Sequence, residues 1–235
     1  MPEIKPSRLT WNKIRSIVED FRNEYIDPVD TIPVPIHKII EFKLGLDIRP
    51  IFGLKDRADT EGFLQSNLTC ISVDSKAYLD DRYRFRLNFT LAHEVGHYIL
   101  YAEQYKKMNF ASIGEYIDFQ QSIDDDSIEW FEKQANEFAG RLLVPIDKLK
   151  ELVAAQEEFC KQLTEKLRDD KEEISDKEIE SFVIDSLAGR IYKKFEVSKD
   201  VVKRRIRTEN LKTISNELNG QTVNEIIGEN GTKDK

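Results

Sequence analysis

The sequence is poor in cysteine and histidine, and it has no long apolar run. Its 235 residues include only two cysteines, Cys70 and Cys160, which lie far apart and form no CxxC pair. This excludes a disulfide framework and a zinc-ribbon motif, and it is typical of a reducing compartment. No stretch approaches the ~18 uninterrupted apolar residues of a membrane span, and the charged N-terminal segment is unlike a signal peptide. We therefore expect a cytoplasmic protein without a membrane segment.

The chain also lacks an excess of positive charge. Its formal net charge is −8. Broad, nonspecific nucleic-acid binding depends on Lys and Arg side chains that neutralise phosphates, so this charge argues against it. Apolar residues make up 40% of the sequence, which is enough for a sizeable core in a chain of this length.

Apolar spacing predicts an α+β fold that is rich in helix. Short strands are expected over residues 46–52, 60–65 and 68–74. Helices are expected over 10–25, 35–45, 82–104 and 126–144, and residues 106–127 are expected to form a loop. A domain over 1–150 is then followed by a charged helical linker over 151–180 and a small helical unit over 181–235. The sequence shows no internal repeat.

Two of the three histidines belong to the stretch "TLAHEVGHYIL". His93 and His97 are four residues apart, so they share one face of a helix and can bind one metal ion together. Zinc suits imidazole ligands, and it lowers the pKa of water enough to supply a nucleophile at neutral pH. Glu94 follows the first histidine and would lie beside the metal, where a carboxylate can act as the base. A histidine pair can also be an ordinary surface or core feature, but the scarcity of histidine here favours a metal site.

A catalytic zinc needs a third protein ligand, and the segment "EWFEKQANEFAGRLLVP" offers one. Glu132 and Asn136 are four residues apart and share a face beside small alanines. Spacing alone gives Glu132 only a slight preference over Glu129, because most helix glutamates are solvated. His37 lies early in the chain, where a satisfied histidine on a helix surface is the expected role.

The two segments together resemble the ImmA/IrrE-like zinc metallopeptidases. The resemblance rests on "FTLAHEVGHYIL" and "EKQANEFAGRLLVP" and extends over roughly residues 30–150. It implies a thermolysin-like domain with a small mixed sheet, followed by a helical C-terminal region. It also implies one Zn²⁺ per chain with His93, His97 and Glu132 as ligands, Asn136 supporting them and Glu94 as the catalytic residue. The implied substrate is a helix-turn-helix repressor or antitoxin, cleaved by metalloendopeptidase action.

The C-terminal stretch "FEVSKDVVKRRI" predicts a helix that Ser198 caps. Basic residues are expected on its outer face: Lys203, Arg204, Arg205 and Arg207. A turn followed by a basic helix is compatible with DNA binding, but the acidic chain favours a structural helix pair packed on the peptidase domain. Two other functions stay open. The protein could be a zinc-containing module that sequesters a repressor without cutting it, or a DNA-binding regulator with a structural metal site.

Overall fold

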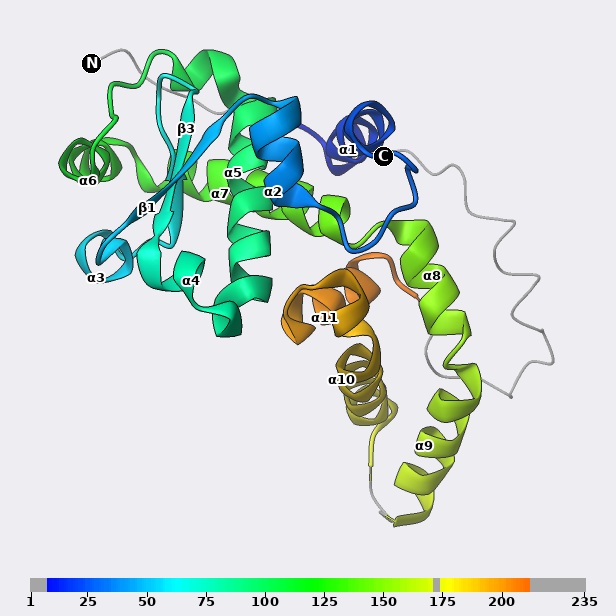
Figure 1. Cartoon of the computed structure of the whole chain (residues 1–235). Coiled ribbons are helices and arrows are strands. Elements are labelled where there is room, and N and C mark those ends of the chain that lie inside the picture. Colours follow the sequence, from blue (N-terminus) through cyan, green and yellow to red (C-terminus); the bar gives the residue numbers. More distant parts are fainter. Residues whose placement is uncertain (1–7, 171–173, 212–235) are drawn as a thin grey trace.

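The computed structural model of the chain describes residues 8–170 and 174–211. These residues form a small sheet surrounded by helices (Figure 1). The strands are β1 (Asp47–Ile51), β2 (Gly62–Leu64) and β3 (Cys70–Asp74). The α-helices are α1 (Trp11–Tyr25), α2 (Ile36–Lys38), α3 (Leu54–Ala58), α4 (Ser75–Leu79), α5 (Arg84–Tyr105), α6 (Ile113–Ser122), α7 (Asp125–Leu143), α8 (Ile146–Ala154), α9 (Glu157–Asp170), α10 (Asp176–Phe195) and α11 (Lys199–Thr208). A π-helix, η1 (Ile39–Lys43), continues α2, and a 3₁₀-helix, η2 (Asp81–Tyr83), precedes α5.

The sheet has three strands in the order β1-β3-β2. β1 pairs with β3 in parallel, from Asp47↔Cys70 to Ile51↔Asp74. β2 pairs with the other side of β3 in antiparallel register, centred on Phe63↔Ser72. The sheet is therefore mixed, and the predicted α+β class with a helical C-terminal region is confirmed. Every residue of the central strand β3 is buried.

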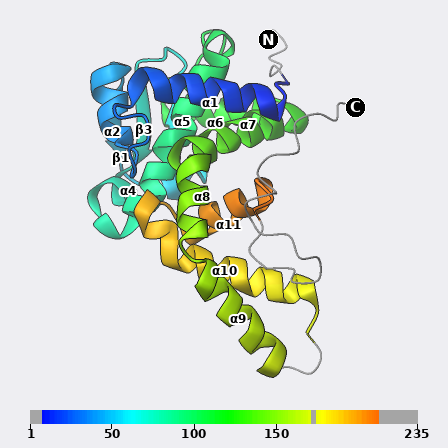
Figure 2. The ribbon, with the colours of Figure 1, turned by 90° about the vertical axis from the view of Figure 1, so that its right-hand side faces the viewer.

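Helix α5 runs beside the sheet, and α7 packs on α5 (Figure 1). Helix α1 lies along α7 on the side away from the sheet (Figure 2). An edge-on contact between Phe21 of α1 and Phe138 of α7, with ring centroids 5.6 Å apart, belongs to the apolar core between these helices. The three helices thus form layers, with α7 in the middle.

The elements before α5 largely follow the local sequence signals. The Thr10 side chain caps α1 by accepting a hydrogen bond from the backbone N–H of Lys13 at 3.2 Å, as its residue type predicts. Gly45 ends the next helical segment with a φ of 67°, in the left-handed region that glycine favours. The three predicted strands are present, each shorter than expected, and β2 has only half of its predicted length.

The expected loop over residues 106–127 is wrong, because it contains α6. The Ser112 side chain accepts a hydrogen bond from the backbone N–H of Glu115, and the Glu115 carboxylate accepts one in return from the Ser112 N–H. This capping box satisfies N–H groups at the helix start and stabilises the first turn. Its sequence signature was present, but the surrounding aromatic and acidic residues masked the helical period.

The C-terminal hairpin of α10 and α11 packs against α7 and α9. Ser198 caps α11 as predicted. The expectation that Arg205 lies on the outer face is wrong, because its side chain is only 4% exposed. Arg205 lies three residues after the buried Val202 and so shares the inward face of the helix. Of the other basic residues, Lys203 pairs with Asp185 at 3.0 Å, whereas Arg204 is exposed.

Within the segment expected as a linker, the end of α8, all of α9 and the start of α10 are helical. Arg190 of α10 donates a hydrogen bond to the side chain of Gln156 at 2.6 Å and lies over the Phe159 ring. One cluster of buried apolar side chains extends from α1 to α11. The division at residues 150 and 180 stays a prediction. Among the helices in the described part of the chain, none has both the length and the apolar character needed to cross a membrane.

Candidate metal centre

Helix α5 brings His93 and His97 to one face, as their spacing predicts. Their Nε2 atoms lie 2.9 Å apart. His97 is buried and His93 is partly exposed, so the pair lies at the border between core and solvent. Two neutral imidazoles with facing lone pairs would repel each other, so this arrangement calls for a cation or a proton between them.

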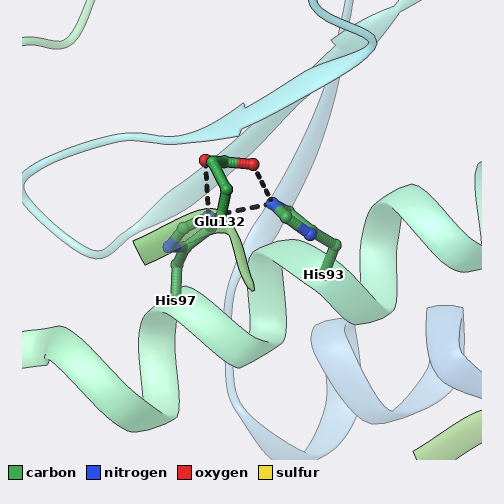
Figure 3. Close-up of side chains that lie close together, drawn as sticks. All are labelled: His93, His97 and Glu132. Carbon is green, nitrogen blue, oxygen red and sulfur yellow. Dashed lines mark hydrogen bonds and ion pairs between the residues drawn. The ribbon is translucent and has the colours of Figure 1, made fainter. Parts of the chain in front are cut away.

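Glu132 of α7 completes the group (Figure 3). Its Oε2 lies 3.1 Å from Nε2 of His93, and its Oε1 lies 3.4 Å from Nε2 of His97. One possible ligand atom from each of the three residues falls within 4.8 Å of the others. Glu129 instead points to solvent, where it pairs with Lys133 at 2.6 Å. The structure therefore brings Glu132, and not Glu129, to the two histidines.

The donor set fits a divalent metal ion. Two imidazole nitrogens and one carboxylate, converging from two helices, match the ligand types that catalytic zinc uses. Within the described residues, Nδ1 of His97 is buried without a hydrogen-bond partner. That ring therefore has its polar contacts only on the Nε2 side, where the other two donors lie. His37 lies elsewhere, with its ring 6.4 Å from that of Tyr78.

Electrostatics in the group favour a positive charge at its centre. Burial lowers the pKa of His93, but the carboxylate of Glu132, which bonds this ring, outweighs burial and raises the pKa to about 9. Burial also opposes ionisation of Glu132, yet its bonds to both imidazoles hold the pKa of Glu132 far below its ordinary range. The carboxylate therefore favours its negative form, and the group as a whole favours a positive charge beside the two Nε2 atoms.

Asn136 orients His93 from the outer side. Its Oδ1 lies 3.2 Å from Nδ1 of His93. Because an amide oxygen can only accept, Nδ1 carries the proton, and Nε2 of the neutral ring keeps its lone pair for the centre. A hydrogen bond of this kind fixes both the tautomer and the orientation of a metal-binding histidine.

Glu94 lies next to the group but outside it. Its side chain is buried, and its Oε2 accepts a hydrogen bond from the backbone N–H of Leu64 in β2 at 2.8 Å. Burial raises the pKa of Glu94, while the two histidines and the Leu64 N–H act in the opposite direction, and the balance stays above the ordinary value. A carboxylate with a raised pKa, held in one orientation, is suited to accept and return a proton.

The Leu64 N–H is the part of the site that sequence analysis missed. It belongs to β2, whose Gly62 lies so close to α5 that an added Cβ would fall 2.7 Å from Cγ2 of Thr90. The position of a backbone N–H cannot be predicted from residue types, so Gly62 was the only sign in the sequence that β2 lies close to α5. Tyr105 was also missed. It is buried two turns after His97, and the two ring centroids lie 5.5 Å apart.

A family model matches residues 84–207, which is more than half of the chain. It is Peptidase_M78, described as the IrrE N-terminal-like domain. The chain belongs to this family. Peptidase_M78 proteins are metal-dependent peptidases, so the family and the His93–His97–Glu132 group agree on a metallopeptidase-type function with a protein substrate. A comparison with curated proteins finds no match.

In this Peptidase_M78 chain, α5 and α7, which carry the His93–His97–Glu132 group, meet at Gly96. A Cβ on Gly96 would lie 3.1 Å from the backbone oxygen of Ala135 and 3.3 Å from Cβ of Phe138. Any larger residue must therefore push α7 away from α5. Because Glu132 lies one turn before Ala135, a shift of a few tenths of an ångström at this contact would also displace its carboxylate relative to the histidines.

Gly96→Ala is expected to destabilise the fold by about 1–3 kcal/mol, because overpacking forces backbone shifts in a close-packed interface. It is also expected to weaken metal binding, measured by zinc titration at a temperature where the variant is folded. Urea denaturation gives the free energy of unfolding.

The matched control is Gly114→Ala in α6, where an added Cβ meets nothing within 4 Å. Alanine is the better helix former, so this variant should be unchanged or more stable by roughly 0.5–1 kcal/mol. If Gly96→Ala behaves like Gly114→Ala in both measurements, the close contact does not set the geometry of the centre.

Proposed function

We propose that the protein is a zinc-dependent endopeptidase. The observation that carries this proposal is the convergence of His93, His97 and Glu132, with the buried carboxylate of Glu94 directly beside them. In this assignment the three residues hold one Zn²⁺ per chain, and Asn136 orients His93. Two imidazoles and one carboxylate leave a position open for solvent, as in zinc hydrolases.

The chemistry divides between the ion and the chain. A zinc ion bound here would act as a Lewis acid toward water and toward a peptide carbonyl. Glu94 accepts the proton of the attacking water on its carboxylate and then delivers it to the nitrogen of the leaving amine. The hydrogen bond from the Leu64 N–H holds that carboxylate in one orientation between the two transfers. Breaking of the peptide C–N bond then releases two fragments.

The substrate that we propose is a helix-turn-helix repressor or an antitoxin, and the site of action is the cytoplasm. The resemblance to ImmA/IrrE-like peptidases supports the substrate. The two free, buried cysteines are compatible with a reducing compartment.

Direct DNA binding is not favoured, because several basic side chains of the C-terminal hairpin pair with acidic side chains of the protein or are buried. Lys199 and Lys203 both pair with Asp185, and Arg205 is buried. DNA binding requires Lys and Arg side chains that are free to contact phosphates.

The alternative is a zinc-containing module that binds its partner without cutting it. The burial of Glu94 beside the histidines argues for the peptidase, because a structural zinc site has no use for a buried carboxylate next to its ligands. In a cleavage assay the two functions give different products. A peptidase releases fragments of the partner, whereas a sequestering module leaves it at full length.

Glu132→Gln is expected to weaken zinc binding by more than the roughly 10–100-fold that loss of an outer-shell partner costs, because it removes the only negative charge among the ligands. The matched control is Glu129→Gln, one turn earlier on α7 and exposed. Competition titration with a chromophoric chelator measures both affinities. Equal affinities for the two variants would remove Glu132 from the ligand set.

Glu94→Gln is expected to keep zinc and to lose about 10²–10⁴-fold in cleavage rate, because the amide cannot accept the proton. The assay incubates the zinc-loaded protein with helix-turn-helix proteins encoded nearby and detects fragments by mass spectrometry. Samples with chelator and with Glu103→Gln, an exposed glutamate of the same helix, serve as controls. Cleavage by Glu94→Gln at the wild-type rate would refute its role as the base.

A further inference from the structure

Helix α7 is held on two different faces. One face carries Glu132 and Ala135 and packs against α5. Another face carries Glu137 and Arg141, which are four residues apart and point toward α11. A helix that is held on only one side can still tilt or rotate, so contacts on the second face determine where the first face points.

The contacts on the second face form a buried cluster of four charges, which we call the Arg–Glu cluster. Arg141 lies 2.6 Å from Glu137 and 3.0 Å from Glu209 of the segment that ends α11. Arg205 lies 2.9 Å from Glu209 and 3.8 Å from Glu137. Each of the four side chains is at most 14% exposed. The charges of the two arginines and two glutamates therefore neutralise one another, and water screens them only a little.

Arginines also satisfy the end of α7. The last carbonyl groups of a helix have no partner within the helix, and cations near them are favoured by the helix dipole. Nη1 of Arg22 in α1 donates to the carbonyl oxygen of Leu142 at 2.8 Å, and Nε of Arg205 donates to that of Val144 at 3.4 Å. The aliphatic part of Arg205 lies against Gly140, where an added Cβ would fall 3.4 Å from Cδ. The same arginine thus holds both a side chain and the backbone of α7.

Small movements of this end reach the metal centre. Ala135, which contacts Gly96, lies three residues from Glu132 and nine from Val144, or about 4.5 Å and about 13.5 Å along the helix axis. If α7 pivots at Ala135, a displacement of about 1 Å at Val144 moves Glu132 by about 0.3 Å in the opposite direction. Metal–ligand distances hold to within about 0.2 Å, so a displacement of this size is comparable to the tolerance of a metal site.

We infer that Arg205 and Glu209 are positioning residues for the metal centre. Through the Arg–Glu cluster they fix the tilt and rotation of α7, and thereby the place of Glu132 beside His93 and His97. Buried ion pairs often contribute little net stability, whereas they can fix one arrangement among several. The inference rests on the proposed role of Glu132 as a ligand. It makes the α10–α11 hairpin a working part of the peptidase rather than a separable unit.

The test compares the stabilisation that zinc gives to the full-length wild type, Arg205→Met and Arg204→Met. Arg204 is the exposed neighbour on the same helix and serves as the matched control. Each protein is melted in chelator and in excess zinc, because a ligand that binds only the folded state raises Tm according to its affinity. Direct titration at a temperature where all three proteins are folded gives the zinc affinity itself.

Arg205→Met is expected to have a lower Tm than the wild type in chelator, and excess zinc should raise its Tm by less. Its zinc affinity should be about 10–100-fold lower, which is the loss typical when a residue that supports a metal ligand is removed. Arg204→Met should match the wild type in all three values. If zinc raises the Tm of Arg205→Met and of the wild type by the same amount, the inference is overturned and Arg205 has only a structural role.

A second variant covers the case in which Arg205→Met does not fold. Glu209→Gln keeps the shape of the side chain and removes its charge, so a smaller loss of zinc affinity in the same direction is expected. Unchanged affinity would overturn the inference. If zinc does not raise the Tm of the wild type, the proposed metal centre is refuted, and the inference with it.

Discussion

The close approach of α5 and α7 at Gly96 is the contact on which the candidate site depends. The two histidines belong to one helix and the glutamate to another, so their meeting requires the two backbones to lie closer than side chains normally permit. Glycine provides this space because it has no Cβ, and Ala135 opposite it is almost as small. The apolar core on both sides then holds the two helices at this separation. The packing of α5 against α7 therefore sets the relative positions of His93, His97 and Glu132.

The second constraint is that each charged group next to the core needs a partner. Glu132 is held by two imidazoles, Glu94 by the Leu64 N–H and Arg205 by Glu209. Glu94 and Arg205 are buried, so an unpartnered charge at either would be costly, and their partners fix where the two side chains point. Strand β2, helix α5 and helix α11 therefore all contribute to one arrangement around α7. Family membership in Peptidase_M78 agrees with the chemistry that such an arrangement can perform.

Local features of the chain were predictable from the sequence, whereas relations between helices were not. The spacing of His93 and His97 fixes their common face, and capping residues mark the start of α1 and α11. The choice between Glu132 and Glu129 depends on the rotation of α7 about its axis, which only packing decides. For the same reason Arg205 was expected outside, although it faces the core. The hydrogen bond from the backbone of β2 to Glu94 could not be predicted, because only Gly62 marks the close approach of β2 to α5.

A crystal structure of the zinc-loaded protein, with data collected at the zinc absorption edge, tests the central claim most directly. We predict one anomalous peak per chain, about 2.0–2.1 Å from Nε2 of His93 and of His97 and about 2.0–2.2 Å from a carboxylate oxygen of Glu132. Absence of a peak at this position, or a peak bound by the histidines while Glu132 points elsewhere, would contradict it.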